Sequence, residues 1–335
     1  MSKKISYKEA GVDIAAGEEA VAKIKELVRS TFTPQVLTDI GKFGGFYSLE
    51  SEEYKEPVLV SSIDGVGTKL KVAFMTGVHN SVGEDLVNHC VNDILVGGAK
   101  PLFFLDYVGT GKLKPETVKE LISGMVRGCR QVNCALIGGE MAEMPGFYQK
   151  GEYDVAGCIV GLVEKSRIID GSLIKKGNLL VGLPSNGLHT NGYSLTRKVL
   201  FEKAGFNTDT YITELGTTVG DELLKVHRCY FNSVYPILKK VDIKGMSHIT
   251  GGGIIGNTKR ILPEGLSLKI HWRNWTIPPI FNLIQREGNV ADEEMRRTFN
   301  LGIGFIIIVE EKNVDFLMEE LKERGEKPLI VGEVV

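Results

Sequence analysis

Residues 61–69 of the sequence, Ser-Ser-Ile-Asp-Gly-Val-Gly-Thr-Lys, gather a carboxylate, two glycines, a hydroxyl and an ammonium group in one short stretch. The apolar run 58–60 before them predicts a buried strand that ends at Asp64. Glycines let backbone N–H groups approach an anion without interference from a Cβ atom. Asp64 could therefore hold Mg²⁺ while Thr68 and Lys69 donate to phosphate oxygens. A tight turn with solvated charges explains this segment, taken alone, equally well.

Two further predicted strands also end in acidic residues. The apolar run 101–105 leads to Asp106, and the short run 134–137 leads through two glycines to Glu140. Ligand sites in α/β folds collect at strand ends and in the loops that follow them. We therefore expect one or more Mg²⁺ ions, bound to a polyphosphate, among the carboxylates of these turns and of a neighbouring helix: Asp64, Asp93, Asp106, Glu140 and Glu143.

The neighbouring helix is predicted at residues 83–96, where apolar residues recur at helical spacing. Its other face carries Asp85, His89 and Asp93 at positions i, i+4 and i+8, with two asparagines beside them and no lysine or arginine. A polar helix face is usually only solvated. Because this one lacks basic partners, it favours contact with a metal ion or a polar ligand.

Two loops of the second half combine hydrogen-bonding side chains with glycines. The loop 184–192 precedes a helix predicted at 193–203, and a histidine with three consecutive glycines precedes a helix predicted at 254–261. A loop that leads into a helix N-terminus suits an anionic group. Asn-Gly turns, a helix cap and a structural histidine are the simpler explanations. The candidate residues are His189, Asn191, His248, Gly251, Gly252 and Gly253.

The alternation of strand and helix patterns predicts an α/β (α+β) fold in two domains. The polar, glycine-bounded stretch 164–177 predicts the boundary between them. We therefore expect an amino-terminal sheet domain at 1–168 and a carboxy-terminal α/β sheet domain at 169–335. Further helices are expected at 18–30, 115–131, 221–240, 279–287 and 313–324, and further strands at 155–163, 178–183, 266–271, 301–309 and 328–335.

The composition is that of an ordinary soluble globular protein, with 335 residues of which 43% are hydrophobic and 24% charged. A net charge of −2 gives no electrostatic reason to expect nucleic acid or an anionic membrane as a partner. The five cysteines form no CxxC pair, and no signal peptide or membrane-spanning run is apparent, which favours the cytoplasm. Walker A, GxSxG and HExxH motifs are absent, which excludes P-loop, serine-hydrolase and zincin chemistry.

Eight ordered motifs resemble the phosphoribosylformylglycinamidine cyclo-ligase family, whose members are also called aminoimidazole ribonucleotide synthetases. They occupy residues 7–14, 64–69, 91–93, 101–107, 138–146, 188–195, 248–253 and 298–304. The resemblance covers essentially the whole chain. Met141 departs from the threonine that the family usually has in Gly-Gly-Glu-Thr-Ala-Glu, and Pro184-Ser185-Asn186 departs from the commoner Ser-Ser-Gly.

The resemblance implies a homodimer in which the amino-terminal sheets pair into a barrel-like interface, with ATP along a cleft in the amino-terminal half. It also implies a reaction of purine biosynthesis. ATP would phosphorylate the formamide oxygen of formylglycinamidine ribonucleotide, and an amidine nitrogen would close the ring of aminoimidazole ribonucleotide. The catalytic candidates are His189, Asn191 and His248. The expected nucleotide contacts are Lys25, Asp64, Gly65, Gly67, Thr68, Lys69, Asp93, Gly138, Gly139, Glu140, Gly251, Gly252 and Gly253.

Related ATP-dependent enzymes of the same fold are the alternatives. Selenophosphate synthetase needs a reactive cysteine near the amino terminus, whereas the first cysteine here is Cys90, on an apolar helix face. The larger formylglycinamidine synthetase needs extra domains for which 335 residues leave no room. A thiamine monophosphate kinase would lack the motifs at 188–195 and 248–253. A non-catalytic nucleotide-binding module would be expected to have lost the acidic strand ends, and they are intact.

Overall fold

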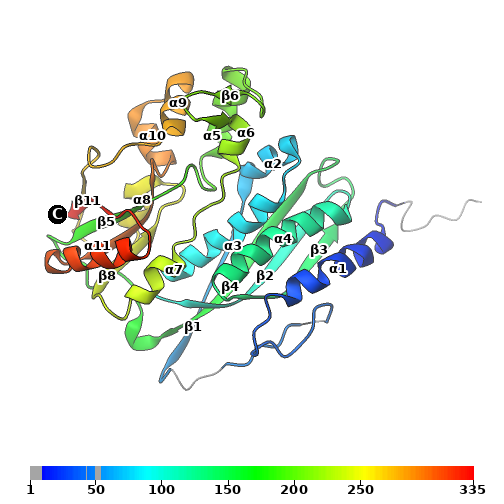
Figure 1. Cartoon of the computed structure of the whole chain (residues 1–335), viewed down its shortest axis with the longest axis horizontal. Helices are drawn as coiled ribbons and strands as arrows, with labels where there is room; N and C mark the ends of the chain where they lie inside the picture. Colours follow the sequence, from blue (N-terminus) through cyan, green and yellow to red (C-terminus); the bar gives the residue numbers. More distant parts are fainter. Residues whose placement is uncertain (1–9, 43, 50–53) are drawn as a thin grey trace, which may run out of the picture.

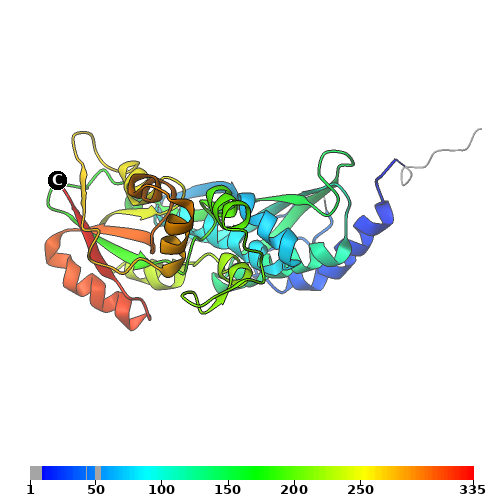
Figure 2. The same ribbon diagram turned by 90° about the horizontal axis from the view of Figure 1, so that it is seen from above.

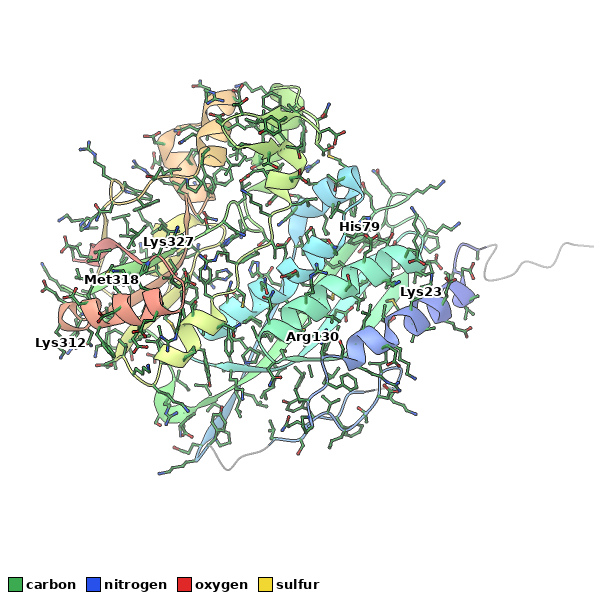
Figure 3. The ribbon with its side chains drawn as sticks, viewed as in Figure 1. Lys23, His79, Arg130, Lys312, Met318 and Lys327 are labelled. Carbon is green, nitrogen blue, oxygen red and sulfur yellow. The ribbon has the colours of Figure 1, made fainter. Side chains whose placement is uncertain are left out.

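Two mixed α/β domains lie side by side in the computed structural model, which describes residues 10–42, 44–49 and 54–335 (Figures 1 and 2). Lys23 on the first helix and Lys312 near the last helix mark opposite ends of the molecule (Figure 3). The beginning of the motif at 7–14 lies outside the described residues. Within the described part of the chain, no helix is both long and apolar enough to cross a membrane.

Four strands form the sheet of the amino-terminal domain, in the spatial order β1 (Pro57–Gly65), β4 (Tyr153–Glu164), β2 (Lys100–Thr110) and β3 (Ala135–Glu143). Strand β4 is antiparallel to both of its neighbours, whereas β2 and β3 are parallel. A parallel pair needs a crossover connection, which helix α4 provides. The helices α1 (Ile14–Arg29), α3 (Asn80–Leu95) and α4 (Pro115–Gln131) cover one face of this sheet (Figure 1).

The other face of the amino-terminal sheet presents apolar side chains to solvent. On the edge strand β1, Leu59 and Ile63 are 58% and 71% exposed, and Tyr107 of β2 is also exposed. Ile63 and Leu105 both stand opposite Cys158 in the strand register, so these side chains share one face. The sheet of a single chain is open, and the barrel-like interface between two chains stays a prediction.

Five strands form the carboxy-terminal sheet, and every neighbouring pair is antiparallel. Their order is β8 (Ile243–His248), β10 (Ile303–Val309), β5 (Leu179–Pro184), β11 (Leu329–Val334) and β9 (Leu268–Ile270). The predicted boundary after residue 168 falls between β4 and β5. The remaining elements are α2 (Leu70–Thr76), α5 (Tyr193–Arg197), β6 (Tyr211–Ile212), β7 (Thr217–Thr218), α8 (Gly253–Lys259), α9 (Pro279–Gly288), α10 (Asp292–Thr298) and α11 (Val314–Glu323).

The prediction of one long helix at 221–240 is wrong. The chain instead forms the short helices α6 (Val219–Leu223) and α7 (Phe231–Val234), separated by a non-helical segment. Backbone groups of residues 227–230 bind side chains of α3 and so cannot complete helical hydrogen bonds. Tertiary contacts here outweigh helix propensity, which is only a weak preference.

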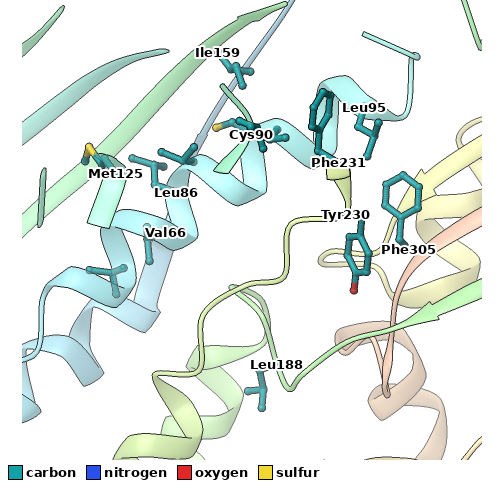
Figure 4. Packing of buried hydrophobic residues seen from close by; sticks show 14 of the residues in the cluster. Val66, Leu86, Cys90, Leu95, Met125, Ile159, Leu188, Tyr230, Phe231 and Phe305 are labelled. Atoms are coloured by element: carbon teal, nitrogen blue, oxygen red, sulfur yellow. The ribbon is translucent and has the colours of Figure 1, made fainter. Parts of the chain in front are cut away.

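One continuous hydrophobic core joins the two domains. Leu86 and Cys90 of α3 belong to it on the amino-terminal side, and Tyr230 and Phe305 belong to it on the carboxy-terminal side (Figure 4). The rings of Tyr230 and Phe305 pack with centroids 5.3 Å apart. Because α3 is buried between the domains, its polar side chains are held at their boundary.

Candidate active site between the two domains

Helix α3 docks the carboxy-terminal domain through polar side chains that bind the segment 227–230. Asp85 Oδ1 accepts from the backbone N–H of His227 (2.6 Å), and Asn88 Nδ2 donates to the carbonyl of the same residue (2.8 Å). Asn92 Nδ2 donates to the next carbonyl (2.7 Å), and its Oδ1 accepts from the N–H of residue 230 (2.9 Å). Much of the polar face therefore binds protein backbone and is not available to a ligand.

The ammonium group of Lys69 forms a second contact between the domains. Lys69 and Asp85 have no exposed side-chain surface, and Lys69 Nζ lies 2.7 Å from Asp85 Oδ2. Nζ also donates to the carbonyl oxygens of Lys225 (2.7 Å) and His189 (3.3 Å). Burial lowers the pKa of Lys69 and raises that of Asp85, and the opposite charges partly offset both effects. With its donors used, Lys69 joins the domains and does not make the expected phosphate contact.

A cavity of about 340 Å³, here called the interdomain cavity, opens between the two domains. Asn191 Nδ2 in its wall is buried and has no hydrogen-bond partner among the described residues. A buried N–H group without a partner is unfavourable, so this amide is suited to bind a ligand oxygen. The cavity is lined by α3 and by the loops after β1, β5 and β8, through Asp64, Gly65, Val66, Gly67, His89, Thr190, Asn191, Thr250 and Gly251.

Two imidazole–carboxylate pairs lie together beside the interdomain cavity. His89 Nε2 is 2.8 Å from Asp64 Oδ2 and 3.9 Å from Asp93 Oδ2, while His248 Nδ1 is 2.8 Å from Asp93 Oδ1. Burial disfavours a protonated His89, but the carboxylates of Asp64, Asp93 and Asp85 outweigh burial and raise its pKa. Burial also opposes the anionic forms of Asp64 and Asp93, yet the paired imidazoles leave both pKa values lowered. For His248 burial prevails and the pKa is lowered.

Two more histidines complete the cluster behind the cavity wall. His227 Nε2 is 2.9 Å from His248 Nε2, and His227 Nδ1 is 3.2 Å from Thr190 Oγ1, which is 2.8 Å from His89 Nδ1. The ring of His189 stacks on that of His227 at 4.1 Å. Burial holds the pKa of His189 and of His227 well below the ordinary value. His189 does not line the interdomain cavity, so its position does not support the expected catalytic role.

The carboxylates of β2 and β3 are separate from those beside the interdomain cavity. Asp64, Gly157, Asp106 and Gly139 stand opposite one another across four strands. Because neighbouring strands are about 4.8 Å apart, Asp64 and Gly139 are separated by about 14 Å. Glu140, the next residue, points to the opposite face because side chains alternate along a strand. One ion therefore cannot contact Asp64 and Glu140 of the same chain, which corrects the expected convergence of these carboxylates.

Two of the expected metal ligands have other environments. Glu143 accepts hydrogen bonds from the backbone N–H groups of Asp13 (2.5 Å) and Leu113 (2.8 Å), so both of its carboxylate oxygens bind the chain itself. Burial raises the pKa of Asp106 to about 7. This shift reflects the burial of Asp106, and no cationic side chain among the described residues lowers its pKa. Neither residue is placed as a Mg²⁺ ligand.

A larger cavity of about 500 Å³, here called the α1 cavity, lies beside helix α1 and strand β3. Ile24 and Val28 contribute to its apolar wall. Lys25 is partly exposed and forms an ion pair with Asp39 (3.2 Å), which is a lining residue. The α1 cavity also contains four residues that were expected at the site, Asp106, Gly138, Gly139 and Glu140.

Comparison with known proteins identifies the family of the chain. The model described as AIR synthase related protein, N-terminal domain, matches residues 52–163, and its C-terminal counterpart matches residues 175–335. A phosphoribosylformylglycinamidine cyclo-ligase of Syntrophotalea carbinolica is 54% identical over 332 residues, which are 99% of this chain and 95% of that protein. The chain belongs to this cyclo-ligase family. A member from Thermoanaerobacter sp. is also 54% identical, over 99% of this chain and 98% of that protein.

The cyclo-ligase chain shares its fold with more distant solved structures. Escherichia coli HypE aligns with a TM-score of 0.65 at 16% sequence identity, covering 93% of this chain and 90% of that one. Thiamine-monophosphate kinase from Stenotrophomonas maltophilia aligns with a TM-score of 0.64 at 12% identity, covering 93% of each chain. At these identities the likeness shows the two-domain fold alone.

Several of the predicted site residues lie in or beside the interdomain cavity. Lining the interdomain cavity are Asp64, Gly65, Gly67, Asn191 and Gly251, and Asp93 and His248 contact its inner wall. Thr68 lies nearby, with its hydroxyl 3.0 Å from Ser194 Oγ. Gly252 and Gly253 both have positive φ, a backbone conformation that favours glycine, and a Cβ on Gly253 would also lie 1.9 Å from the carbonyl oxygen of Arg296.

Sequence reasoning missed three polar residues of the site and did not single out a fourth. Thr190 and Thr250 line the interdomain cavity but lie in motifs from which only other members were chosen. His89 was recognised by its i, i+4 spacing to Asp93 as part of a helix face that favours a metal ion or polar ligand, but it was not chosen as an individual site residue. His227 carried no signal, because it lies inside a segment that was predicted to be helical.

Proposed function

We propose that the chain catalyses the ATP-dependent ring closure of formylglycinamidine ribonucleotide to aminoimidazole ribonucleotide, with release of ADP and phosphate, in purine biosynthesis. The observation that carries this proposal is 54% identity, over 99% of the chain, to proteins named phosphoribosylformylglycinamidine cyclo-ligase. The interdomain cavity supports it, because it presents a carboxylate, glycines and a free amide donor to one space.

The reaction consists of two substitutions. In the first, the formamide oxygen of the substrate forms a bond to the γ-phosphorus of ATP, and the bond from that phosphorus to ADP breaks. In the second, an amidine nitrogen bonds to the activated carbon, the phosphorylated oxygen leaves as phosphate, and the nitrogen loses a proton. Charge develops on oxygen atoms in both steps, so positioning and hydrogen-bond donors account for most of the catalysis.

Asn191 is the donor best placed for this chemistry, because its amide nitrogen is buried in the cavity wall without a partner among the described residues. We assign it to an oxygen of the formamide or of the transferred phosphoryl group. A Cβ on Gly251 would lie 3.2 Å from Asn191 Oδ1, so the glycine leaves room for this amide. His248 does not line the interdomain cavity. We assign it to holding the Asp93 carboxylate in place through the hydrogen bond between His248 Nδ1 and Asp93 Oδ1.

Mg²⁺ fits Asp64 best among the proposed metal ligands. The Asp64 side chain is 40% exposed and faces the interdomain cavity. Mg²⁺ typically binds one or two carboxylates together with substrate phosphates and several waters, and Asp93 supplies the second carboxylate. When bound, the ion would neutralise phosphate charge. Glu140 with its two preceding glycines stays a proposed nucleotide contact at the α1 cavity.

We also propose a homodimer that forms across the open face of the amino-terminal sheet. Leu59 and Ile63 are large, apolar and mostly exposed on this face. Exposed large apolar side chains on a sheet face typically mark a protein–protein interface. Pairing this face between two chains would give the barrel-like arrangement that the family resemblance implies.

The test is an assay of purified chain with ATP, Mg²⁺ and formylglycinamidine ribonucleotide. We expect ADP and aminoimidazole ribonucleotide in equal amounts, and no ADP formation when thiamine monophosphate replaces the substrate. Asn191→Ala should lower kcat/KM by about 10²-fold, the typical effect of losing one donor to a developing oxyanion. Asn232→Ala, an exposed asparagine of α7, is the matched control. ADP formation with thiamine monophosphate alone would favour the kinase, and no turnover with either substrate would favour a binding module.

A further inference from the structure

Three ligand atoms on two domains are arranged as in a transition-metal site. His89 Nε2, a carboxylate oxygen of Asp93 and His248 Nδ1 all lie within 4.8 Å of one another. His248 Nδ1 lies 2.8 Å from Asp93 Oδ1, and His89 Nε2 lies 3.9 Å from Asp93 Oδ2. Neighbouring ligands in a tetrahedral zinc site with bonds near 2.0 Å are about 3.3 Å apart. Small side-chain rotations would therefore bring one atom of each residue to a shared ion.

The outer nitrogen of each imidazole already has a partner. His89 Nδ1 lies 2.8 Å from Thr190 Oγ1, and His248 Nε2 lies 2.9 Å from His227 Nε2. A histidine that binds a metal donates a hydrogen bond from its other ring nitrogen, which fixes the ring. The proton positions are consistent, because His227 Nε2 can accept from His248 while His227 Nδ1 donates to Thr190 (3.2 Å).

The ligand types select the class of ion. Two imidazoles with one carboxylate suit Zn²⁺, Co²⁺, Mn²⁺ and Fe²⁺, whereas Mg²⁺ takes oxygen ligands. Asp64 Oδ2, 2.8 Å from His89 Nε2, adds negative charge at the side that opens to the interdomain cavity. The alternative set of His189, His227 and His248 is unsuitable, because the first two rings are stacked with an interplanar angle of 22°. Lone pairs of stacked rings run side by side and do not converge on one ion.

We propose that the chain binds one transition-metal ion of the zinc and cobalt class through His89, Asp93 and His248, with Asp64 beside the open coordination position. This site shares Asp93 with the proposed Mg²⁺–phosphate contact but adds two imidazole ligands, and its test does not depend on the proposed reaction. His89 and Asp93 belong to α3, whereas His248 ends β8. The bound ion would therefore cross-link the two domains.

The experiment uses the full chain without an affinity tag, stripped with EDTA and titrated with CoCl₂ and ZnCl₂ by calorimetry and visible absorption. We expect one ion per chain, visible Co²⁺ bands of a four- or five-coordinate site, and a thermal transition that rises with metal concentration. His89→Ala and Asp93→Asn should each lower Co²⁺ affinity by at least about tenfold. His271→Ala, at a partly exposed histidine of the other domain, is the matched control and should bind normally.

Three outcomes would overturn the site. One is that the wild-type chain binds Co²⁺ no more tightly than His89→Ala does. Another is that His271→Ala loses as much Co²⁺ affinity as His89→Ala. The third is displacement of Co²⁺ by a modest excess of Mg²⁺, which would show oxygen ligands in place of imidazoles. Circular dichroism of each variant separates loss of the ligand from loss of the fold. Failure of this test would leave the ring-closure assay unaffected, because that assay uses Mg²⁺ and needs no transition-metal ion.

Discussion

Replacing Lys69 tests whether this residue joins the domains or binds phosphate. Lys69→Met removes an ammonium group with no exposed surface and leaves Asp85 charged and equally buried. The carbonyl oxygens of His189 and Lys225 lose this donor as well. Breaking a buried ion pair by removing one partner costs about 3–5 kcal/mol. We expect the free energy of unfolding to fall by that amount, with a loss on the order of 10 °C in Tm.

The assay is urea and thermal unfolding followed by circular dichroism. Lys165→Met is the matched control, because its ion pair with Glu56 (3.1 Å) joins side chains that are 62% and 64% exposed. Exposed pairs contribute little, so this variant should unfold like the wild type. Lys69→Met combined with Asp85→Asn should be more stable than Lys69→Met alone, since the asparagine removes the unpaired charge and keeps an acceptor for the His227 N–H.

The opposite result would refute the structural reasoning. If Lys69→Met unfolded like Lys165→Met while its KM for ATP rose strongly, the ammonium group would contact phosphate, as the sequence first suggested. If the double variant were no more stable than Lys69→Met, the loss would come from packing and not from an uncompensated charge.

Three further predictions concern turnover, pH and assembly. Asp64→Asn should abolish Mg²⁺-dependent turnover with an unchanged circular dichroism spectrum, and retained activity at low Mg²⁺ would remove Asp64 from the metal site. Burial lowers the pKa of His79, which precedes α3 (Figure 3). Below about pH 6.5 the unfolded chain therefore binds more protons at His79 than the folded chain does, so the free energy of unfolding falls as the pH falls. His79→Gln should therefore lose less unfolding free energy than the wild type between about pH 7.5 and about pH 5.5, and equal losses in unfolding experiments would contradict this. Ile63→Lys should give monomers in size-exclusion chromatography with light scattering, and a retained dimer would exclude this face as the interface.

Much of the fold follows from local patterns. The apolar runs that predicted strands at 101–105, 155–163 and 301–309 lie within β2, β4 and β10 or overlap them closely. Hydrophobic periodicity likewise located the helices α3 and α4. The failure at 221–240 has a physical cause, because side chains of α3 bind the backbone of that segment and only the folded chain brings them together.

The candidate site was predictable where one loop supplies the residue. Asp64, Asn191 and Gly251 were chosen from their own loops, and all three line the interdomain cavity. Partners that come from another element were not predictable in this way. The sequence places Lys69 beside glycines and Thr68, which suggested phosphate, whereas the fold buries it against Asp85.

Outside the segment 221–240, local sequence determined most of the strands and helices, and homology determined the family, because both depend on residue types in order along the chain. Strand register and domain docking decided which of the predicted site residues lie together. Strand register places Glu140 three strand spacings from Asp64 and on the opposite face of the sheet. Domain docking brings His248 into contact with Asp93, which lies 155 residues away in the sequence. Such contacts depend on how whole elements pack, and no window of sequence contains that information.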